Sequence, residues 1–519
     1  MRLKKLTALT LSTIMAASML TACGSGNSTA SQSSGAGSSE AAGNEAGSGG
    51  EQAADSGETA DLELYAISFG GNNDSLAKVN EAVNEYIKPL INADVKLNII
   101  SYGSYAQQVN LMMSGDEQVD LMLSTGSLTS NLAGQGALMP LDDLLASQGA
   151  DIVDVMGEDV LASCKYGGVT YAVPTNRDLA RSMCYYYRDD INQELGLGLE
   201  NAKTLDDIEK CFEIMHEKDP EMAGIAGNNT SSLLKDWNWD AISNNYGVLM
   251  DLGSELEVVN LYETDEYKAL VERMYDWYQK GYIYKEIATS TVSSPDLFAT
   301  GKMLGFFANG NPTQDNSQSQ ILGGPIKHIE LVEPYMSSTT VQTACWTIPH
   351  NSKNPEKAME LLNLMYTDAT LVNLLTYGIE GENYVIKDAE QGIIGYPEGQ
   401  DAQTRTYDNT LGWTWGNMLI GYTWEGDDPD VHQQMIDFNN SARRSKALGF
   451  TFDPTNVQNQ ITACSNVATK YTVGIESGSL NPAEALPKFQ EELKSAGIDD
   501  IIAEKQRQLD EWAAGNGIE

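Results

Sequence analysis

Positive charge, histidine and patterned cysteine are all scarce in this sequence. The 519 residues include 32 Lys and Arg against 73 Asp and Glu, for a formal net charge of −41, and only four His and six Cys. No CxxC or HExxH pattern occurs, so we expect no structural or catalytic metal site. The cysteines beyond Cys23 are odd in number and irregularly spaced, which argues against a disulfide framework. We expect them to be buried as small hydrophobic residues; they are Cys164, Cys184, Cys211, Cys345 and Cys464.

The charge balance and the missing motifs also exclude classes of function. A chain this acidic repels nucleic-acid phosphates and anionic lipid headgroups. The part expected to fold has no GxSxG motif and no Walker loop, and Gly196-Leu197-Gly198 lacks the third glycine of a dinucleotide loop. We therefore expect no cofactor, no catalytic residue and no enzyme activity. A glycoside hydrolase stays open as an alternative, because it needs only two well-placed carboxyl groups and carboxylates are abundant here.

The first residues have the profile of a secretory signal. Arg2, Lys4 and Lys5 precede an apolar run, 6–20, which is too short for a comfortable membrane span. Leu20-Thr21-Ala22-Cys23 resembles the bacterial lipobox, in which the cysteine is lipidated and the peptide before it, here 1–22, is removed. The alternative is an ordinary signal peptide with a chance cysteine.

Residues 23–60 predict a flexible tether. Beyond Cys23 this stretch consists almost entirely of small and polar residues without an aromatic or branched aliphatic side chain, so burial cannot offset the entropy of ordering it. A lipidated end followed by a tether predicts an extracytoplasmic protein that is anchored to the cell membrane and does not span it.

The next hundred residues alternate between strand and helix patterns. Residues 62–67, 95–99 and 119–123 predict strands, and the segments between them predict helices, with Pro89 close to the end of the first. This order indicates a parallel sheet covered by helices, and ligands of such sheets bind beyond the carboxyl ends of the strands. The loops 68–75 and 124–127 lie there; they are either ligand contacts or simple polar turns.

Tryptophans beside polar residues suggest a ligand class. Trp237-Asn238-Trp239-Asp240 and Trp413-Thr414-Trp415-Gly416-Asn417 alternate rings with polar side chains. A pyranose has an apolar face that a ring can cover and hydroxyls that Asn or Asp can bind. The alternative for each ring is a place in the core.

Several motifs in order resemble those of the family 1 extracellular solute-binding proteins of ABC importers. Gly136 to Asp142 is similar to "G-x-L-x-P-L-D", and Gly168 to Pro174 to "G-x-x-Y-A-x-P". Phe298 to Lys302 is similar to "F-x-x-G-K", and Asn354 to Ala358 to "N-P-E-x-A". The C-terminal half resembles a subgroup with an extended C-terminal region.

The resemblance implies an α/β protein with the two-lobe, type II periplasmic-binding fold, a central cleft and a hinge. The expected boundaries are 61–174 plus 328–390 for the first lobe and 178–325 plus 395–519 for the second. The last part, with helices at 482–496 and 499–514, is expected to pack on one lobe without a role in ligand binding.

The predicted function is capture of a small ligand and its delivery to the membrane subunits of an ABC permease. A carbohydrate is preferred, a peptide or another solute stays open, and we expect a monomer. Residues 175–178 follow the hairpin where relatives first cross between lobes, and Trp346 lies where they return. The predicted ligand contacts are Phe69, Asn72, Asn73, Asp74, Thr125, Ser127, Asn176, Arg177, Asp178, Trp237, Trp239, Asp240, Asn309, Asn311, Trp346, Trp413, Trp415 and Asn417.

Overall fold

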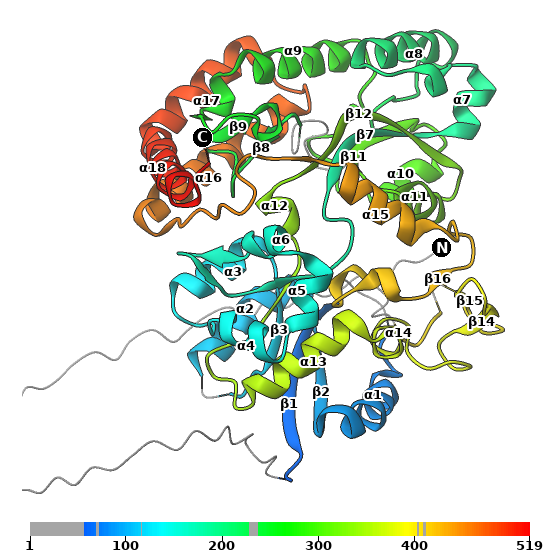
Figure 1. Cartoon of the computed structure of the whole chain (residues 1–519). Coiled ribbons are helices and arrows are strands. Elements are labelled where there is room, and N and C mark those ends of the chain that lie inside the picture. Colours follow the sequence, from blue (N-terminus) through cyan, green and yellow to red (C-terminus); the bar gives the residue numbers. More distant parts are fainter. Residues whose placement is uncertain are drawn as a thin grey trace, which may run out of the picture. The chain divides into compact units, whose positions relative to one another are not determined.

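The computed structural model describes residues 57–68, 72–115, 117–227, 237–401, 404–407 and 412–518 (Figure 1). Residues 1–22, Cys23 and most of the expected tether lie outside this part of the chain. Ala60, expected at the end of the tether, is the first residue of strand β1 (Ala60–Ser68). Within the described ranges, no helix is both long and apolar enough to cross a membrane.

The first sheet contains the three parallel strands that the alternating pattern predicts, and two further strands. Strands β1, β2 (Ala93–Ser101) and β3 (Leu121–Ser124) are parallel and are joined by α1 (Leu76–Ile91) and α2 (Tyr102–Ser114). Helix α1 continues two residues beyond Pro89. Strands β13 (Cys345–Thr347) and β6 (Val173–Pro174) complete the order β2-β1-β3-β13-β6, and β13 runs antiparallel to both of its neighbours.

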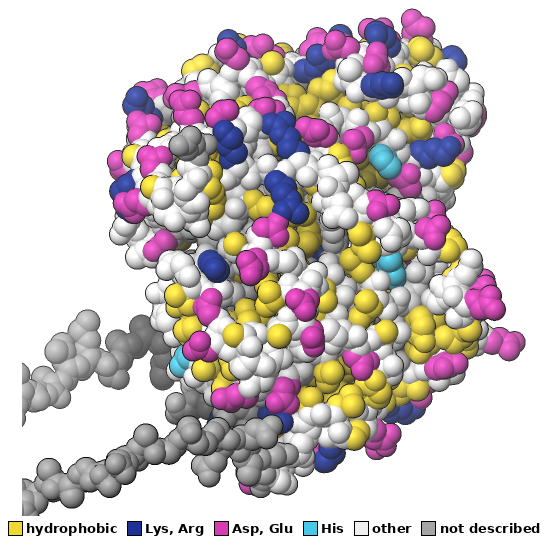
Figure 2. Space-filling view, viewed as in Figure 1, with side chains coloured by type: hydrophobic (Ala, Val, Ile, Leu, Met, Phe, Trp, Pro, Cys, Tyr) yellow, Lys and Arg dark blue, Asp and Glu magenta, His cyan; other side chains and the backbone are white. Residues whose placement is uncertain are grey.

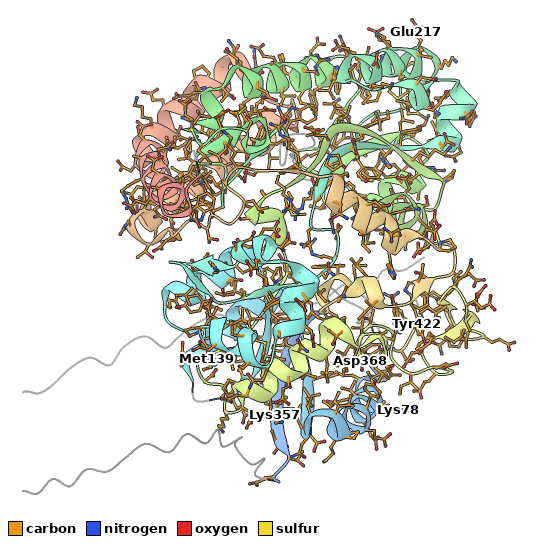
Figure 3. All side chains as sticks on the ribbon, viewed as in Figure 1. Lys78, Met139, Glu217, Lys357, Asp368 and Tyr422 are labelled. Carbon is orange, nitrogen blue, oxygen red and sulfur yellow. The ribbon has the colours of Figure 1, made fainter. Side chains whose placement is uncertain are left out.

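Helices bury the apolar faces of this sheet. Val79, Val83 and Ile87 recur every four residues on α1, and all three are fully buried. Helix α13 (Pro355–Thr367) contacts β1 and passes in front of it in Figure 1. Asp368, labelled in Figure 3, caps α14 (Ala369–Tyr377) and accepts a hydrogen bond from Tyr86 of α1 at 2.8 Å. We call the resulting hydrophobic cluster the first core; it includes residues from Leu62 to Ala180 and from Met336 to Ala442.

The second sheet has the order β11-β7-β12-β17. Strand β7 (Arg181–Arg188) lies antiparallel between β11 (Gly305–Gly310) and β12 (Ile326–Met336), and β17 (Arg443–Arg444) runs parallel to β12. Strand β7 is buried on both faces, which explains its unbroken apolar and aromatic run. Tyr185 and Tyr187 face one cluster, and Cys184 and Tyr186 face another.

Five long helices contribute buried side chains to the hydrophobic cluster that one face of the second sheet joins. They are α8 (Leu205–Lys218), α9 (Asp265–Gln279), α16 (Gln458–Glu476), α17 (Pro482–Ala496) and α18 (Ile498–Asn516), all on the upper side of Figure 1. The last two confirm the helix pair that the sequence predicts. We call this hydrophobic cluster the second core; it includes residues from Met183 to Tyr335 and from Ala447 to Leu509.

Shorter elements connect these layers. The helices are α3 (Gly126–Gly134), α4 (Asp142–Ser147), α5 (Ala150–Met156), α6 (Glu158–Ala162), α7 (Asp189–Leu195), α10 (Ser294–Ala299), α11 (Gln314–Leu322), α12 (Ser338–Val341) and α15 (Val431–Ser441). The strands are β4 (Lys165–Tyr166), β5 (Val169–Thr170), β8 (Trp239–Asp240), β9 (Val248–Met250), β10 (Val258–Val259), β14 (Val385–Asp388), β15 (Ile393–Gly395) and β16 (Thr423–Trp424). Short 3-10 turns include Gly412–Thr414 and Met418–Ile420.

The chain passes between the two cores three times, and the three crossings lie side by side. They fall between Ala180 and Met183, between Tyr335 and Met336, and between Ala442 and Ala447. Tyr335 pairs with Arg181 on one side and with Arg443 on the other, so β7, β12 and β17 meet where the chain changes core.

Two segments lie elsewhere than the sequence-based boundaries place them. The division at 328 puts most of β12 in the first lobe, but β12 hydrogen-bonds to β7 and buries Ile329, Val332 and Tyr335 in the second core. Residues 395–442 were expected with the second lobe. Tyr407 and Trp415 of this span are buried in the first core, while helix α15 contacts β12 of the second sheet. The strand pattern alone does not show which sheet a strand joins.

Asn439 of α15 fastens the first crossing. Its Oδ1 accepts hydrogen bonds from the N–H groups of Leu179 and Ala180 at 2.8 and 3.1 Å, and its Nδ2 donates to the carbonyl of Arg177 at 2.6 Å. Leu179 and Ala180 are buried, so no solvent can replace these bonds.

We predict that Asn439→Ala lowers the free energy of unfolding by about 2 to 4 kcal/mol, because it leaves two buried N–H groups without an acceptor. The neighbouring Asn440 is exposed, so Asn440→Ala changes stability by no more than about 0.5 kcal/mol. Urea denaturation of the two variants tests the difference, and equal effects would show that Asn439 does not hold the crossing.

Candidate ligand-binding site

Polar side chains follow β1 and β3 at one edge of the first sheet. Leu64 of β1 pairs in parallel with Leu121 of β3, so the carboxyl ends of both strands lie at the same edge. Asn72 and Asp74 are exposed there, and the Asn72 side chain accepts a hydrogen bond from the Asp74 N–H at 2.8 Å. Asn73 and Thr125 are half-buried at the same edge. This is the position at which open α/β sheets bind ligands.

A second group of predicted residues comes together beside the first crossing. Asp178 accepts a hydrogen bond from Asn311 at 2.7 Å and forms an ion pair with Arg177 at 3.2 Å. Asn311 follows β11, and its side-chain oxygen accepts from the N–H and hydroxyl of Thr313. The first crossing and the end of a second-core strand thus share one polar cluster, in which the Asp178 side chain is 21% exposed.

Arg177 is buried within this cluster and bonds to the protein backbone. Its side chain is 4% exposed, and its Nη2 donates to the carbonyl of Thr340 in α12 at 2.9 Å. It also donates to the carbonyl of Asp178. These bonds tie the first crossing to the second, so the guanidinium orients Asp178 while its own donors point into the protein.

Asn176 and Asn417 border a cavity beside the same crossing, and its wall combines polar and apolar side chains. Asn176 donates to Asn417 at 3.1 Å, and Asn417 donates to the carbonyl of Tyr366 at 3.0 Å. The cavity has a volume of about 360 Å³ and is also lined by Asp159, Asn439 and Arg444. Residues of the first core, the first crossing and the third crossing meet around it.

The tryptophans divide into two groups. Trp239, Trp346 and Trp415 are at most 1% exposed, and the rings of Trp346 and Trp415 stack at 5.7 Å in the first core. Trp346 donates its indole N–H to the carbonyl of Thr414 at 3.1 Å. These three rings fill the core instead of presenting a face to a ligand. Trp237 and Trp413 are half-buried and retain exposed surface.

Asp240 is also enclosed. It is 2% exposed and accepts a hydrogen bond from the N–H of Ile242 at 3.0 Å, and burial raises the pKa of its carboxyl group. Asn309 is half-buried on β11, opposite Met183 of β7. Phe69 lies outside the described residues, as does the side chain of Ser127.

Sequence reasoning missed Asn439 and Tyr102. Asn439 lies in a helix without any motif, and its three hydrogen bonds join segments about 260 residues apart, which no local pattern reveals. Tyr102 is 57% exposed at the start of α2, directly after β2. Because β2 is parallel to β1, Tyr102 lies at the same edge of the sheet as Asn72.

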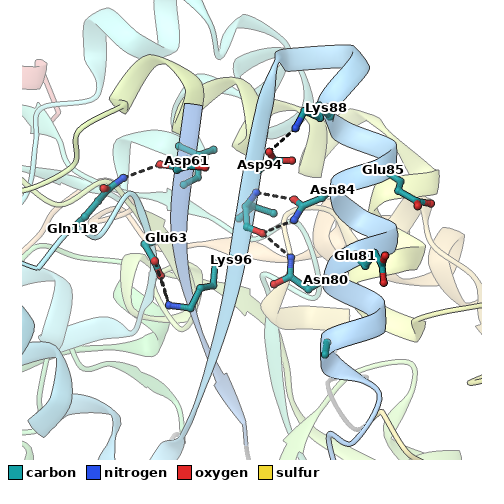
Figure 4. A pocket seen from close by; sticks show the side chains of 13 residues that line it. Asp61, Glu63, Asn80, Glu81, Asn84, Glu85, Lys88, Asp94, Lys96 and Gln118 are labelled. Carbon is teal, nitrogen blue, oxygen red and sulfur yellow. Dashed lines mark hydrogen bonds and ion pairs between the residues drawn. The ribbon is translucent and has the colours of Figure 1, made fainter. Parts of the chain in front are cut away.

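A larger groove of about 930 Å³ lies away from the crossings, between α1 and the strands β1 and β2 (Figure 4). Several of its polar side chains bind one another or the backbone of the strands: Asn84 holds the N–H and carbonyl of Val95, and Lys88 pairs with Asp94 at 2.6 Å. All residues that line the groove come from β1, α1, β2 and the segment before β3, so no residue of the second core borders it. Figure 2 shows acidic side chains scattered over the visible surface, without a single patch that would mark a binding site. Size alone therefore does not make it the candidate site.

The described residues contain no group of three or more His, Cys, Asp or Glu that could hold a metal ion. Cys164, Cys184, Cys211, Cys345 and Cys464 are all buried free thiols, which confirms the prediction.

The sequence profile of the bacterial extracellular solute-binding proteins matches residues 71–371. The chain belongs to this family. A second profile, described as a domain of unknown function (DUF3502), matches residues 446–514, the extended C-terminal region that the sequence distinguishes.

Similar proteins carry related descriptions. A carbohydrate ABC transporter substrate-binding protein of Streptococcus pneumoniae serotype 4 is 27% identical over 470 residues, covering 88% of this chain and 92% of the relative. The crystal structure of the N-glycan transport solute-binding protein NgtS from the same species has a TM-score of 0.78 at 25% identity, covering 88% of this chain and all of that one. NgtS in complex with Man5GlcNAc has a TM-score of 0.69 at 25% identity, covering 89% and 100%. This solute-binding protein therefore has the two-lobe periplasmic-binding fold, with a central cleft and a hinge.

We predict that Trp415→Ala lowers the free energy of unfolding by about 3 to 5 kcal/mol, because it empties a fully buried position. Trp413→Ala, two residues away and half-buried, costs about 1 kcal/mol. Chemical denaturation of both variants distinguishes the core ring from the surface ring; similar losses would contradict this division.

A pH prediction comes from the start of α11, beside the polar cluster. His328 hydrogen-bonds Asp315 at 2.6 Å, which raises the pKa of the imidazole against the opposing effect of burial, with smaller support from Glu330. Because the pKa is higher in the folded protein, the stabilisation is complete below about pH 6.5 and is lost as the pH rises through the raised value. His328→Gln should thus cost more stability at pH 6 than at pH 9, measured by denaturation at both pH values; an equal cost would contradict the ion pair.

Proposed function

We propose that this protein captures an oligosaccharide outside the cytoplasm and hands it unchanged to the membrane subunits of an ABC permease. The observation that carries the proposal is the likeness over nearly the whole described chain to NgtS, whose structure includes a complex with Man5GlcNAc. The relative from Streptococcus pneumoniae that is 27% identical over 470 residues is likewise a carbohydrate ABC transporter substrate-binding protein.

The two hydrophobic cores supply the two lobes of the proposed mechanism. We take the first lobe as 60–180 plus 336–442 and the second as 183–335 plus 447–516, from the residues of each core. A ligand that touches both lobes binds the closed state more tightly than the open state and shifts the population by that difference. The adjacent crossings at Arg181, Tyr335 and Arg443 would form the hinge.

The proposed ligand contacts come from both lobes. The first lobe offers Asn72, Asn73, Asp74, Thr125 and Trp413, and the second offers Asn309, Asn311 and Trp237, with Asp178 between them. Carboxylate and amide groups bind sugar hydroxyls, and an indole covers the apolar face of a pyranose. Asp178 and Asn311 already share a hydrogen bond, so their geometry is set before a ligand arrives.

We further propose that the protein is anchored to the cell membrane and does not cleave its ligand. A lipid on Cys23 and the tether before β1 would hold a monomer near the permease, and two or more acyl chains suffice for stable anchoring. The chain would release its ligand without chemical change, because its carboxylates bind and orient hydroxyls and do not attack a glycosidic bond.

The function is tested by titrating the purified protein with Man5GlcNAc while following Trp fluorescence and thermal unfolding. We expect quenching and saturation, with a stabilisation of about 2.7 kcal/mol when the sugar is at 100 times its Kd. Asp178→Asn and Trp413→Ala should each weaken binding by about tenfold. Glu217→Ala, an exposed change on α8 labelled in Figure 3, should leave binding unaltered.

Other outcomes of the same experiment would contradict the proposal. If peptides stabilise the protein and no sugar in a broad panel does, the ligand is a peptide and not a carbohydrate. If the protein releases product from chromogenic glycosides, it is a glycoside hydrolase and not a binding protein.

A further inference from the structure

Lys505 lies in α18, within the region matched to the domain of unknown function, and is fully buried. Its Nζ donates three hydrogen bonds to backbone carbonyls, to Ala241 at 3.1 Å and to Asn244 and Gly247 at 2.7 Å each. Only an ammonium group carries three N–H donors, so this arrangement uses the charged form. Burial lowers the pKa of Lys505, and the neighbouring carboxylate of Asp240 acts in the opposite direction.

The three carbonyls belong to one loop, Ala241–Gly247, which follows β8. Ile242 and Ser243 have positive φ angles of 36° and 98°. A branched residue such as Ile rarely adopts a positive φ, and such strain persists only where the surroundings impose it. Gly247 lies directly against α18, because a Cβ added to it would approach Ile502 at 3.1 Å and Lys505 at 3.3 Å. The helix therefore determines the shape of the loop.

The other side of this loop faces the boundary between the lobes. Ile242 and Ser243 line a small cavity of about 40 Å³ together with Gly126 and Ser130 of α3, which belongs to the first lobe. The N–H of Ser243 donates to the hydroxyl of Thr339 in α12 at 3.4 Å, so the loop also touches the second crossing. Phe452, another wall of the cavity, lies 5.5 Å from the Lys505 ammonium.

We propose that Lys505 is a positioning residue for ligand binding: it fixes the loop Ala241–Gly247 as the surface of the second lobe that meets α3 when the lobes close. The C-terminal region thereby shapes the cleft from behind, without touching the ligand. This assigns it a role that the sequence-based interpretation of its helices omits. The inference rests on the proposed function, because it concerns closure around the same oligosaccharide.

The first test compares Lys505→Met with Leu509→Ala, a cavity-forming change at another fully buried position of α18. Amide hydrogen exchange reports on the loop without any ligand. In Lys505→Met we expect exchange at Asn244, whose N–H donates to Ala241, to be about tenfold faster than in Leu509→Ala. With Man5GlcNAc, we expect the Kd of Lys505→Met to rise about tenfold and that of Leu509→Ala to stay near the wild-type value.

If Lys505→Met does not fold, a milder pair of variants tests whether the conformation of the loop affects sugar binding. Ser243→Gly and Ser243→Ala both remove the hydroxyl, but only glycine suits a φ of 98° without strain. We expect Ser243→Gly to be at least as stable as Ser243→Ala and to bind the sugar several-fold more weakly, because the loop is freer.

Protected loop amides in Lys505→Met, or equal sugar affinities within the Ser243 pair, would overturn the inference. If the wild-type protein binds no sugar, the proposed function fails, and the exchange comparison still decides whether Lys505 shapes the loop.

Discussion

The architecture depends on three adjacent strands that carry the chain from one core to the other. Tyr335 of β12 pairs with Arg181 of β7 and with Arg443 of β17, so all three passages are hydrogen-bonded neighbours. Arg177 and Asn439 fasten the first passage to α12 and α15. Because rotation about one compact set of strands leaves both cores intact, the lobes can move as rigid bodies. The polar cluster of Asp178 and Asn311 lies beside this set, where a bound ligand would sense the movement.

The proposed role of Lys505 gives the C-terminal region a part in ligand binding. Its helices complete the second core, and Lys505 reaches through that core to a strained loop at the lobe boundary. A buried ammonium bound to three carbonyls is costly to place in a core that apolar residues could fill. Its presence is understandable if the position of the loop matters to binding, since an apolar side chain could pack there but could not hold three carbonyls.

Local patterns in the sequence predict the three parallel strands of the first sheet, the two helices between them and the last two helices, and the structure agrees on these points. The resemblance to the family is confirmed by the profile match. Local patterns fail where the outcome depends on distant partners. Strand β12 joins β7 through a pairing that its own alternation does not specify, and Tyr407 and Trp415 are buried in the first core by contacts with distant segments. The aromatic motifs mislead for the same reason. Trp413 and Trp415 are two residues apart, yet one retains surface and the other is sealed against Trp346.

Binding of a sugar should close the two lobes about the three crossings. Small-angle X-ray scattering of the protein with and without saturating Man5GlcNAc measures this closure, and recovery of the sugar afterwards shows whether it is unchanged. We expect a smaller radius of gyration in the complex and an unaltered sugar. An unchanged radius of gyration at full occupancy would contradict lobe closure, and a cleaved sugar would contradict transport without turnover.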